Sequence, residues 1–106
     1  MIAKKILCEE RLRRVPPGFS WVDHRLVRQG YLRQADAKAW ALYLVLITVG
    51  DENGLSYYGD QSLGRLLSLS VEEIAAGRRQ LERAGVIAYE KPFYQVLGLD
   101  SGERIP

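Results

Sequence analysis

Cysteine and histidine are nearly absent from this chain, whose 106 residues include one of each, Cys8 and His24. A single cysteine cannot close a disulfide within the chain, and it is typical of proteins from a reducing compartment, so we expect a cytoplasmic protein. Zinc fingers need four ligands of these two types, and hydrolase triads need a nucleophile beside a histidine. The scarcity of both residues argues against either class.

Long hydrophobic runs are lacking too. The longest nearly continuous run, residues 39–49, has eleven residues, about half of the roughly 20 that cross a membrane. Lys4 and Lys5 are not followed by an apolar stretch and a cleavage site, so no secretory signal is expected. The sequence has no P-loop, no glycine-rich dinucleotide motif and no H-E-x-x-H motif. We therefore expect a protein that is not an enzyme, has no cofactor, metal or small-molecule substrate, and does not enter a membrane.

Positive charge is concentrated in the N-terminal third of the chain. Residues 1–34 carry eight basic and three acidic side chains, a net charge of +5, whereas the remaining residues carry seven basic and ten acidic ones, a net charge of −3. The overall charge of +2 is too small to indicate a nucleic-acid-binding protein by itself. A basic segment on a mildly acidic body suggests a surface that faces a polyanion, and the alternative is a solvated arginine-rich arm.

The hydrophobic fraction of 47% indicates a globular chain, and the length suits one domain. The apolar residues of segment 1–15 fit neither a helical nor a strand period well, so a strand and a short helix both remain open there. The Pro-Pro-Gly sequence at residues 16–18 ends this element in either case. Phe19 and Trp21 lie two residues apart, as on one side of an extended segment.

Two helices are expected to follow. Asp23 is a candidate N-cap for a short helix that ends at Gln29, with Gly30 in the left-handed position beyond it. Residues 36–49 predict a longer helix that ends before Gly50. Its apolar stripe consists of Trp40, Leu44 and Ile47. Because apolar residues fill most of its other positions as well, this helix should be buried on most sides and form the centre of the core.

The sequence from residue 51 onward predicts a turn, a strand and another helix. An Asp-Glu-Asn-Gly turn at residues 51–54 precedes a short strand at residues 55–58. Asp60 or Ser62 is expected to cap a helix that runs to about Leu67. The inward side of that helix should carry Leu63, Leu66 and Leu67.

A capping box opens the next helix, which we expect over residues 71–84. Ser70 is followed three residues later by Glu73, and Gly85 would terminate the helix. Steps of 100° per residue define its two sides. The buried side should carry Ile74, Gly77 and Leu81, and the opposite side Glu72, Ala76, Arg79 and Arg83.

Two residues of this helix need partners. Glycine within a helix costs about 1 kcal/mol relative to alanine. Gly77 therefore indicates that the preceding helix, residues 60–67, approaches closely there. Arg78 should lie near the core boundary and pair with Glu82 one turn later.

Residues 86–89 and 93–97 are two β-prone runs at hairpin spacing. Two helices joined by a short turn and followed by a hairpin predict a mainly α-helical winged helix-turn-helix fold. The expected organisation is a basic entry segment over residues 1–34, a winged-helix domain over residues 35–99 and a frayed polar tail over residues 100–106.

The stretch from residue 36 to residue 87 resembles the winged helix-turn-helix domain of plasmid and phage replication initiators and primosome-loading proteins. The matching motifs are the apolar run at residues 40–47, the turn at 51–54, the strand and polar cap at 55–63, Leu-Ser at 69–70, Leu-Glu-Arg-Ala-Gly at 81–85 and Val-Ile at 86–87. The resemblance implies DNA binding in replication, transposition or transcription control in bacteria, phages or mobile elements. One departure is the start of the recognition helix, where basic or small hydroxyl residues are replaced by Val71, Glu72 and Glu73.

The expected DNA contacts come from three parts of the chain. They are Arg65, Ser70, Glu72, Ala76, Arg79 and Arg83 around the third helix, Lys91 at the hairpin tip, and Arg11, Arg13 and Arg14 near the N-terminus. Arg79 and Arg83 lie four residues apart and repel each other unless an anion such as a phosphate lies across both. An arm can follow the DNA backbone as homeodomain arms do.

Several of these residues have ordinary structural interpretations as well. Glu72 could complement the helix dipole rather than accept a hydrogen bond from cytosine. The arm arginines could belong to a solvated strand, and the hairpin aromatics Tyr89, Phe93 and Tyr94 are more typical of a core than of a base-stacking platform. The leading hypothesis is a winged helix that binds double-stranded DNA. The alternative is a winged helix that serves as a protein-interaction or homodimerisation module without binding DNA.

Overall fold

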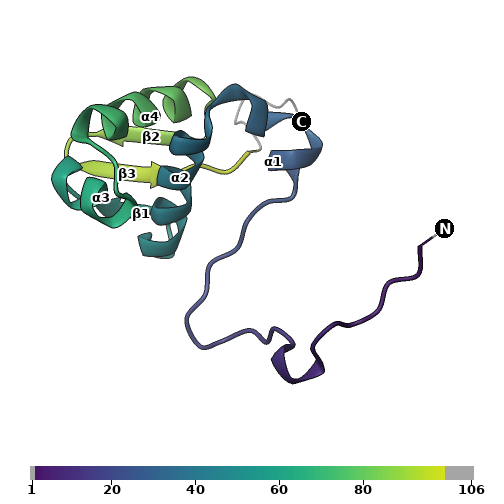
Figure 1. Ribbon diagram of the computed structural model, residues 1–106. Coiled ribbons are helices and arrows are strands. Elements are labelled where there is room, and N and C mark those ends of the chain that lie inside the picture. The colour runs from purple at the N-terminus through teal and green to yellow at the C-terminus, as the bar shows by residue number, and fades with distance from the viewer. Residues whose placement is uncertain (1, 100–106) are drawn as a thin grey trace.

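The computed structural model describes residues 2–99, in which helices alternate with three short strands (Figure 1). The α-helices and strands account for most of the body, and two 3-10 turns (η) lie in the N-terminal third. The elements are η1 Glu9–Arg11, α1 Arg25–Arg28, η2 Tyr31–Gln34, α2 Ala37–Val49, β1 Leu55–Tyr57, α3 Asp60–Leu67, α4 Val71–Arg83, β2 Ile87–Glu90 and β3 Phe93–Val96. The predicted class, mainly helical with a small sheet, is confirmed at this level.

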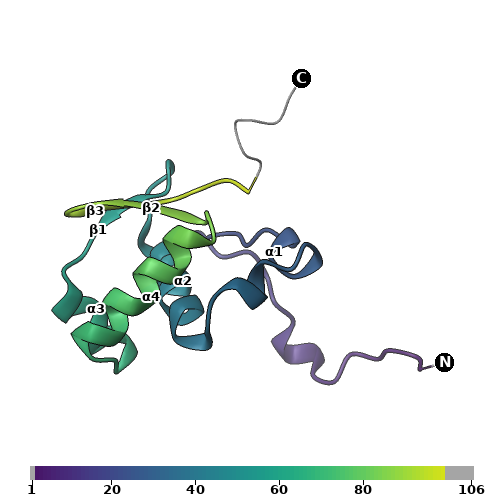
Figure 2. The same cartoon turned by 90° about the horizontal axis from the view of Figure 1, so that it is seen from above.

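The three strands form one antiparallel sheet in the order β1-β3-β2. Tyr94 of β3 lies opposite Ser56 of β1 on one side and opposite Tyr89 of β2 on the other. The strand before the two helices therefore pairs with the hairpin after them. Figure 2 shows this sheet edge-on, with α2, α3 and α4 together on one side of it. The arrangement is compatible with a winged-helix-like fold.

Helix α2 begins and ends as its sequence predicts. Asp36 is the N-cap, and its side chain accepts a hydrogen bond from the Ala39 N–H at 2.8 Å. Its buried side chains are Ala39, Leu42, Tyr43 and Leu46. The expectation that α2 is buried nearly all round is wrong for Leu44, which is 58% exposed. No second layer covers this side of the helix within the described residues, because the N-terminal segment does not pack there.

The start of α3 differs from the prediction. Its N-cap is Gly59, with no side-chain hydrogen bond, and neither Asp60 nor Ser62 caps the helix. Asp60 lies in the first turn, and its carboxylate accepts a hydrogen bond from Arg78 at 2.8 Å. Leu63 is buried as expected, but Leu66 is 59% exposed. A helix of eight residues with one neighbouring layer buries only a narrow stripe.

Helix α4 confirms its capping box and its buried side. The Ser70 hydroxyl accepts a hydrogen bond from the Glu73 N–H, and the Glu73 carboxylate accepts one from the Ser70 N–H, both at 3.0 Å. A Cβ atom added at Gly77 would lie 3.2 Å from the Cα atom of Ala39. The helix that approaches closely at Gly77 is therefore α2, not the preceding α3 as the sequence suggested.

Arg78 takes partners far away in the sequence instead of Glu82. Its guanidinium donates hydrogen bonds to Asp60 of α3 and to the Tyr94 hydroxyl of β3, each at 2.8 Å. It also lies 4.5 Å from the centre of the Tyr89 ring in β2. Burial opposes the charge of Arg78, but the hydrogen bonds to Asp60 and Tyr94 outweigh it and raise the pKa of the guanidinium. The expected i, i+4 pair is replaced because Asp60 reaches the half-buried guanidinium across the α3–α4 packing.

The N-terminal third has less regular structure than expected. For residues 1–15 the sequence left a strand and a short helix open. Within residues 2–15 the structure has one element, the 3-10 turn η1. Every residue from 2 to 22 is exposed. Its apolar residues follow neither period and so present no single face to bury. Residues 2–18, which we call the arm, lead away from the body (Figure 1). The expected tail at residues 100–106 lies outside the described residues.

The short helix expected after Asp23 is present but shorter at both ends. It spans Arg25–Arg28, with His24 at the N-cap position. The Asp23 carboxylate accepts a hydrogen bond from the Arg25 N–H at 2.9 Å. Asp23 therefore makes the hydrogen bond of a capping side chain although it lies one residue before the N-cap position. Gly30 takes the predicted left-handed conformation, with φ of 78°.

Replacing Gly64 of α3 with alanine should destabilise the protein. A Cβ atom there would lie 2.5 Å from the backbone oxygen of Leu69, and overpacking of this kind costs about 1–3 kcal/mol. That loss outweighs the gain of about 1 kcal/mol in helix propensity. We expect a lower urea midpoint in unfolding followed by circular dichroism. Gly18→Ala is the matched control, because a Cβ atom at Gly18 meets nothing within 4 Å; equal midpoints for both variants would contradict the close contact at Gly64.

Candidate nucleic-acid interface

Anchors on both flanks determine which side of α4 faces outward. On one flank Arg78 is held by α3 and the sheet, as described above. On the other flank Glu73 forms an ion pair with Lys38 of α2. Gln80 accepts a hydrogen bond from the Asp36 N–H at 2.7 Å and donates one to the Asp36 carboxylate at 3.1 Å. The remaining side, which we call the outward face of α4, carries Glu72, Ala76, Arg79 and Arg83.

The outward face holds the charges that the sequence placed there. Arg79 and Arg83 are exposed, and within the described residues neither forms an ion pair. Glu72 is also exposed and lies in the first turn, where an acidic side chain complements the helix dipole. Ala76 is half-buried between them. Glu72 and the nearby exposed Glu82 equal Arg79 and Arg83 in number, so this part of α4 has no net charge. Because no net positive charge attracts an anion from a distance, an anion would have to contact the two arginines directly.

Two other expected contacts lie where the end of α3 meets the start of α4. Arg65 of α3 is exposed, and its guanidinium donates a long hydrogen bond of 3.4 Å to the Ser62 hydroxyl. Ser70 is exposed too, but its hydroxyl oxygen already accepts the capping hydrogen bond. That leaves the Ser70 hydroxyl hydrogen as the group able to contact a phosphate.

The hairpin turns at Lys91, which is exposed. Of the nearby aromatic residues, Tyr94 is fully buried and Tyr89 half-buried, which agrees with the core interpretation. Phe93 is on the outer side of the sheet, and its ring contacts the Tyr57 ring edge to face at 5.8 Å. Lys91 is therefore the charged group that the hairpin tip offers.

The arm carries its arginines to a different part of the molecule. Arg11, Arg13 and Arg14 are exposed, and none has an ion pair within the described residues. Figures 1 and 2 both show the arm, drawn in purple, extending away from the end at which β2 and β3 are joined. The structure brings the α3 and α4 residues together but does not place the arm beside them.

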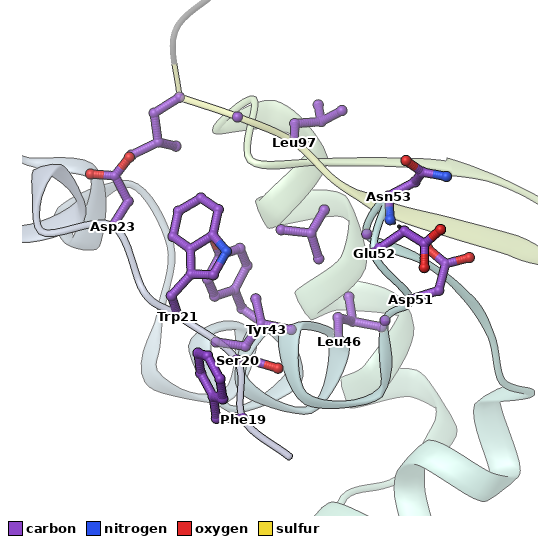
Figure 3. A pocket seen from close by; sticks show the side chains of 16 residues that line it. Phe19, Ser20, Trp21, Asp23, Tyr43, Leu46, Asp51, Glu52, Asn53 and Leu97 are labelled. Carbon is purple, nitrogen blue, oxygen red and sulfur yellow. Dashed lines mark hydrogen bonds between the residues drawn. The ribbon is translucent and has the colours of Figure 1, made fainter. Parts of the chain in front are cut away.

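A groove that sequence reasoning did not identify lies on the side of α2 next to the arm (Figure 3). Its volume is about 420 Å³, within the range of ligand-binding pockets. Its walls come from the entry segment 19–23, α2, the turn at residues 50–54 and residues 96–99. The one signal in the sequence was the alternation of Phe19 and Trp21, both of which line it.

The polar lining of the groove is acidic. Asp23, Asp51 and Glu52 line it, with no lysine or arginine among the described lining residues. Asp51 accepts hydrogen bonds from the N–H groups of Asn53 and Leu55 at 2.8 and 2.9 Å, which shape the turn. Asp23 forms an ion pair with Arg25 at 2.7 Å. The hydrogen bonds from the Arg25 side chain and backbone lower the pKa of Asp23 to about 2.

Comparisons of the chain with models of protein families, with curated proteins and with solved structures find no match. Among the described helices, none has the length and apolar character needed to cross a membrane. Residues 2–99 contain no group of three or more histidine, cysteine, aspartate or glutamate side chains placed to hold a metal ion.

Titration of Asp23 should follow its low pKa. In the folded protein the carboxylate stays ionised well below its ordinary pKa of 3.8, with a midpoint at about 2. The stabilisation from its contacts with Arg25 is therefore complete above the ordinary value and is lost as the pH falls through about 2. NMR titration of the carboxyl carbon measures this midpoint directly.

Arg25→Gln should return the Asp23 midpoint toward 3.8, because it removes the charged donor. Arg28→Gln, which removes a charge from the same helix without contacting Asp23, is the control and should leave the midpoint low. A wild-type midpoint near the ordinary value would contradict the ion pair.

Proposed function

We propose that this chain is a winged helix-turn-helix protein that binds double-stranded DNA, with α4 in the major groove. The observation that carries the proposal is the outward face of α4, where Arg79 and Arg83 are exposed, four residues apart and without an ion pair in the described structure. The major groove is about 12 Å wide and admits one α-helix. Two adjacent guanidinium groups on such a helix can contact guanine edges or phosphates.

The elements around α4 support the same proposal. Helix α3 reaches α4 through the short turn at residues 68–70, the connection expected of a helix-turn-helix. Arg65 lies in the last turn of α3 and the Ser70 hydroxyl lies in the turn itself. The first helix of such a motif crosses the DNA backbone. The β2–β3 hairpin acts as the wing, with Lys91 on a phosphate. Glu72 then either complements the helix dipole or accepts a hydrogen bond from cytosine.

The arm adds charge rather than sequence information. Its Arg11, Arg13 and Arg14 lie within the N-terminal third that carries the net charge of +5 computed from its eight basic and three acidic residues. Extended arms reach adjacent grooves and contact phosphates. The proposed role is binding rather than catalysis, in replication, transposition or transcription control in the cytoplasm of a bacterium or within a phage or mobile element, following the family resemblance.

Reversing the two charges on the outward face should abolish DNA binding. We expect Arg79→Glu/Arg83→Glu to lower the affinity for a random duplex by at least about a hundredfold, because it removes two phosphate contacts and places two negative charges against the DNA backbone. In the wild type the logarithm of the binding constant should fall linearly with the logarithm of salt concentration, with a slope of about −0.9 for each phosphate contacted. Fluorescence anisotropy at several salt concentrations measures both quantities.

Arg28→Glu/Arg33→Glu is the matched control. It changes the net charge by the same amount at two exposed positions of α1 and η2, so long-range electrostatics alone would weaken both variants equally. Binding that survives the α4 variant, or that is lost equally in the control, would exclude α4 as the recognition helix. Wild-type protein that shows no binding at low salt would exclude the function itself.

A further inference from the structure

The groove beside α2 combines aromatic walls with acidic side chains. Phe19, Trp21 and Tyr43 provide aromatic walls, and the first two are 65% and 74% exposed. Asp51 and Glu52 stand at its edge, and Glu52 has no ion pair within the described residues. Aromatic-lined grooves of this kind bind polyproline II segments, whose preformed shape loses little entropy on binding.

The arm of the same chain contains such a segment, residues 12–17. Leu12 has φ of −60° and ψ of 137°, close to polyproline II geometry. Pro16 and Pro17 have their φ angles fixed near −65° by their rings, and Val15 is held extended because it precedes a proline. Leu12, Val15 and Pro16 are therefore restricted to extended backbone before the segment meets any partner, and the chain bends at Pro17 and Gly18.

The side chains of the segment complement the groove. With three residues per turn, Leu12 and Val15 share one edge, about 9 Å apart. Both are exposed in the structure. Arg13 and Arg14 point to the other two edges. The apolar edge matches the aromatic walls, and the arginines match the exposed Glu52 carboxylate, which has no ion pair within the described residues.

We propose that the groove binds residues 12–17 of a second copy of this chain, and that two copies exchange their arms reciprocally. Residues 12–17 do not lie in the groove of their own chain: none of them is among its lining residues, and all of them are exposed. The arm accordingly leads away from the body (Figure 1). The radius of gyration is 16.1 Å, against about 13 Å for a compact chain of this length.

Reciprocal exchange gives a closed dimer. Each copy offers one arm and one groove, so two copies related by a two-fold axis satisfy both contacts and leave no site open for further growth. The inference goes beyond DNA binding. Because Arg13 and Arg14 are also expected to contact phosphates, the experiment is carried out without DNA, and its outcome is independent of whether DNA binds.

Sedimentation equilibrium of the full chain over a range of concentrations tests the exchange. We expect the wild-type mass to double with increasing concentration. Arg13→Glu/Arg14→Glu and, separately, Glu52→Lys should each raise the dissociation constant at least about tenfold, because each places like charges together in the groove. Lys4→Glu/Lys5→Glu is the control for Arg13→Glu/Arg14→Glu: it makes the same charge change in the arm but outside residues 12–17. Glu82→Lys is the control for Glu52→Lys: it makes the same charge change outside the groove. Both controls should dimerise like the wild type.

Mixing the two weakened variants distinguishes exchange between copies from any contact within one copy. In a mixed dimer the arginine arm meets Glu52 and the glutamate arm meets the new lysine, so both contacts become favourable again. We expect the mixture to recover the doubled mass. A contact within one chain would leave both variants as they were.

A synthetic peptide of residues 10–18 provides a second measurement. It should compete with the arms and return the wild type to monomers, whereas the same peptide with Arg13 and Arg14 replaced by glutamate should not. A wild-type chain that stays monomeric at every concentration would overturn the proposal. So would equal weakening in the matched controls, or a mixture that fails to recover.

Discussion

The Arg78 guanidinium joins three elements that are distant in the sequence, and the orientation of α4 depends on it. It binds Asp60 of α3 and Tyr94 of β3 and lies against the Tyr89 ring of β2. A half-buried guanidinium without partners would be strongly destabilising, so this packing is favourable only when all of these groups are in place. With Arg78 turned inward, the 100° step per residue turns Arg79 outward. The candidate interface is thus a consequence of an interaction within the core.

A second set of contacts fixes α4 against α2. Gly77 allows the backbone of α4 to approach Ala39, and the paired hydrogen bonds between Gln80 and Asp36 hold the start of α2 beside it. The helices and the sheet pack against one another, and no described residue packs over Leu44 or the arm, both of which are exposed. The same small core that positions the outward face of α4 leaves the groove beside α2 open.

The parts of the fold that were predicted correctly depend on neighbours along the chain. Asp36 caps α2, Ser70 and Glu73 form their capping box, and Gly30 and Gly85 have positive φ angles. Each of these needs only residues within one turn. The errors at Asp60, Leu66 and Arg78 share the opposite cause. Whether Asp60 caps its own helix or binds Arg78 depends on how two helices pack, and local patterns carry no information on that.

By itself, the sequence determined the order of the elements from residue 36 onward, the caps of α2 and α4, and the two arginines on one side of α4. Caps depend on residues within one turn, and a helical period places side chains around an axis without reference to anything else. Tertiary structure decided which helix lies against Gly77, where Arg78 finds its partners and that a groove exists at all. The walls of that groove come from residues 19–23, α2, residues 50–54 and residues 96–99. Segments so far apart in the chain form one surface only after the core has brought them together.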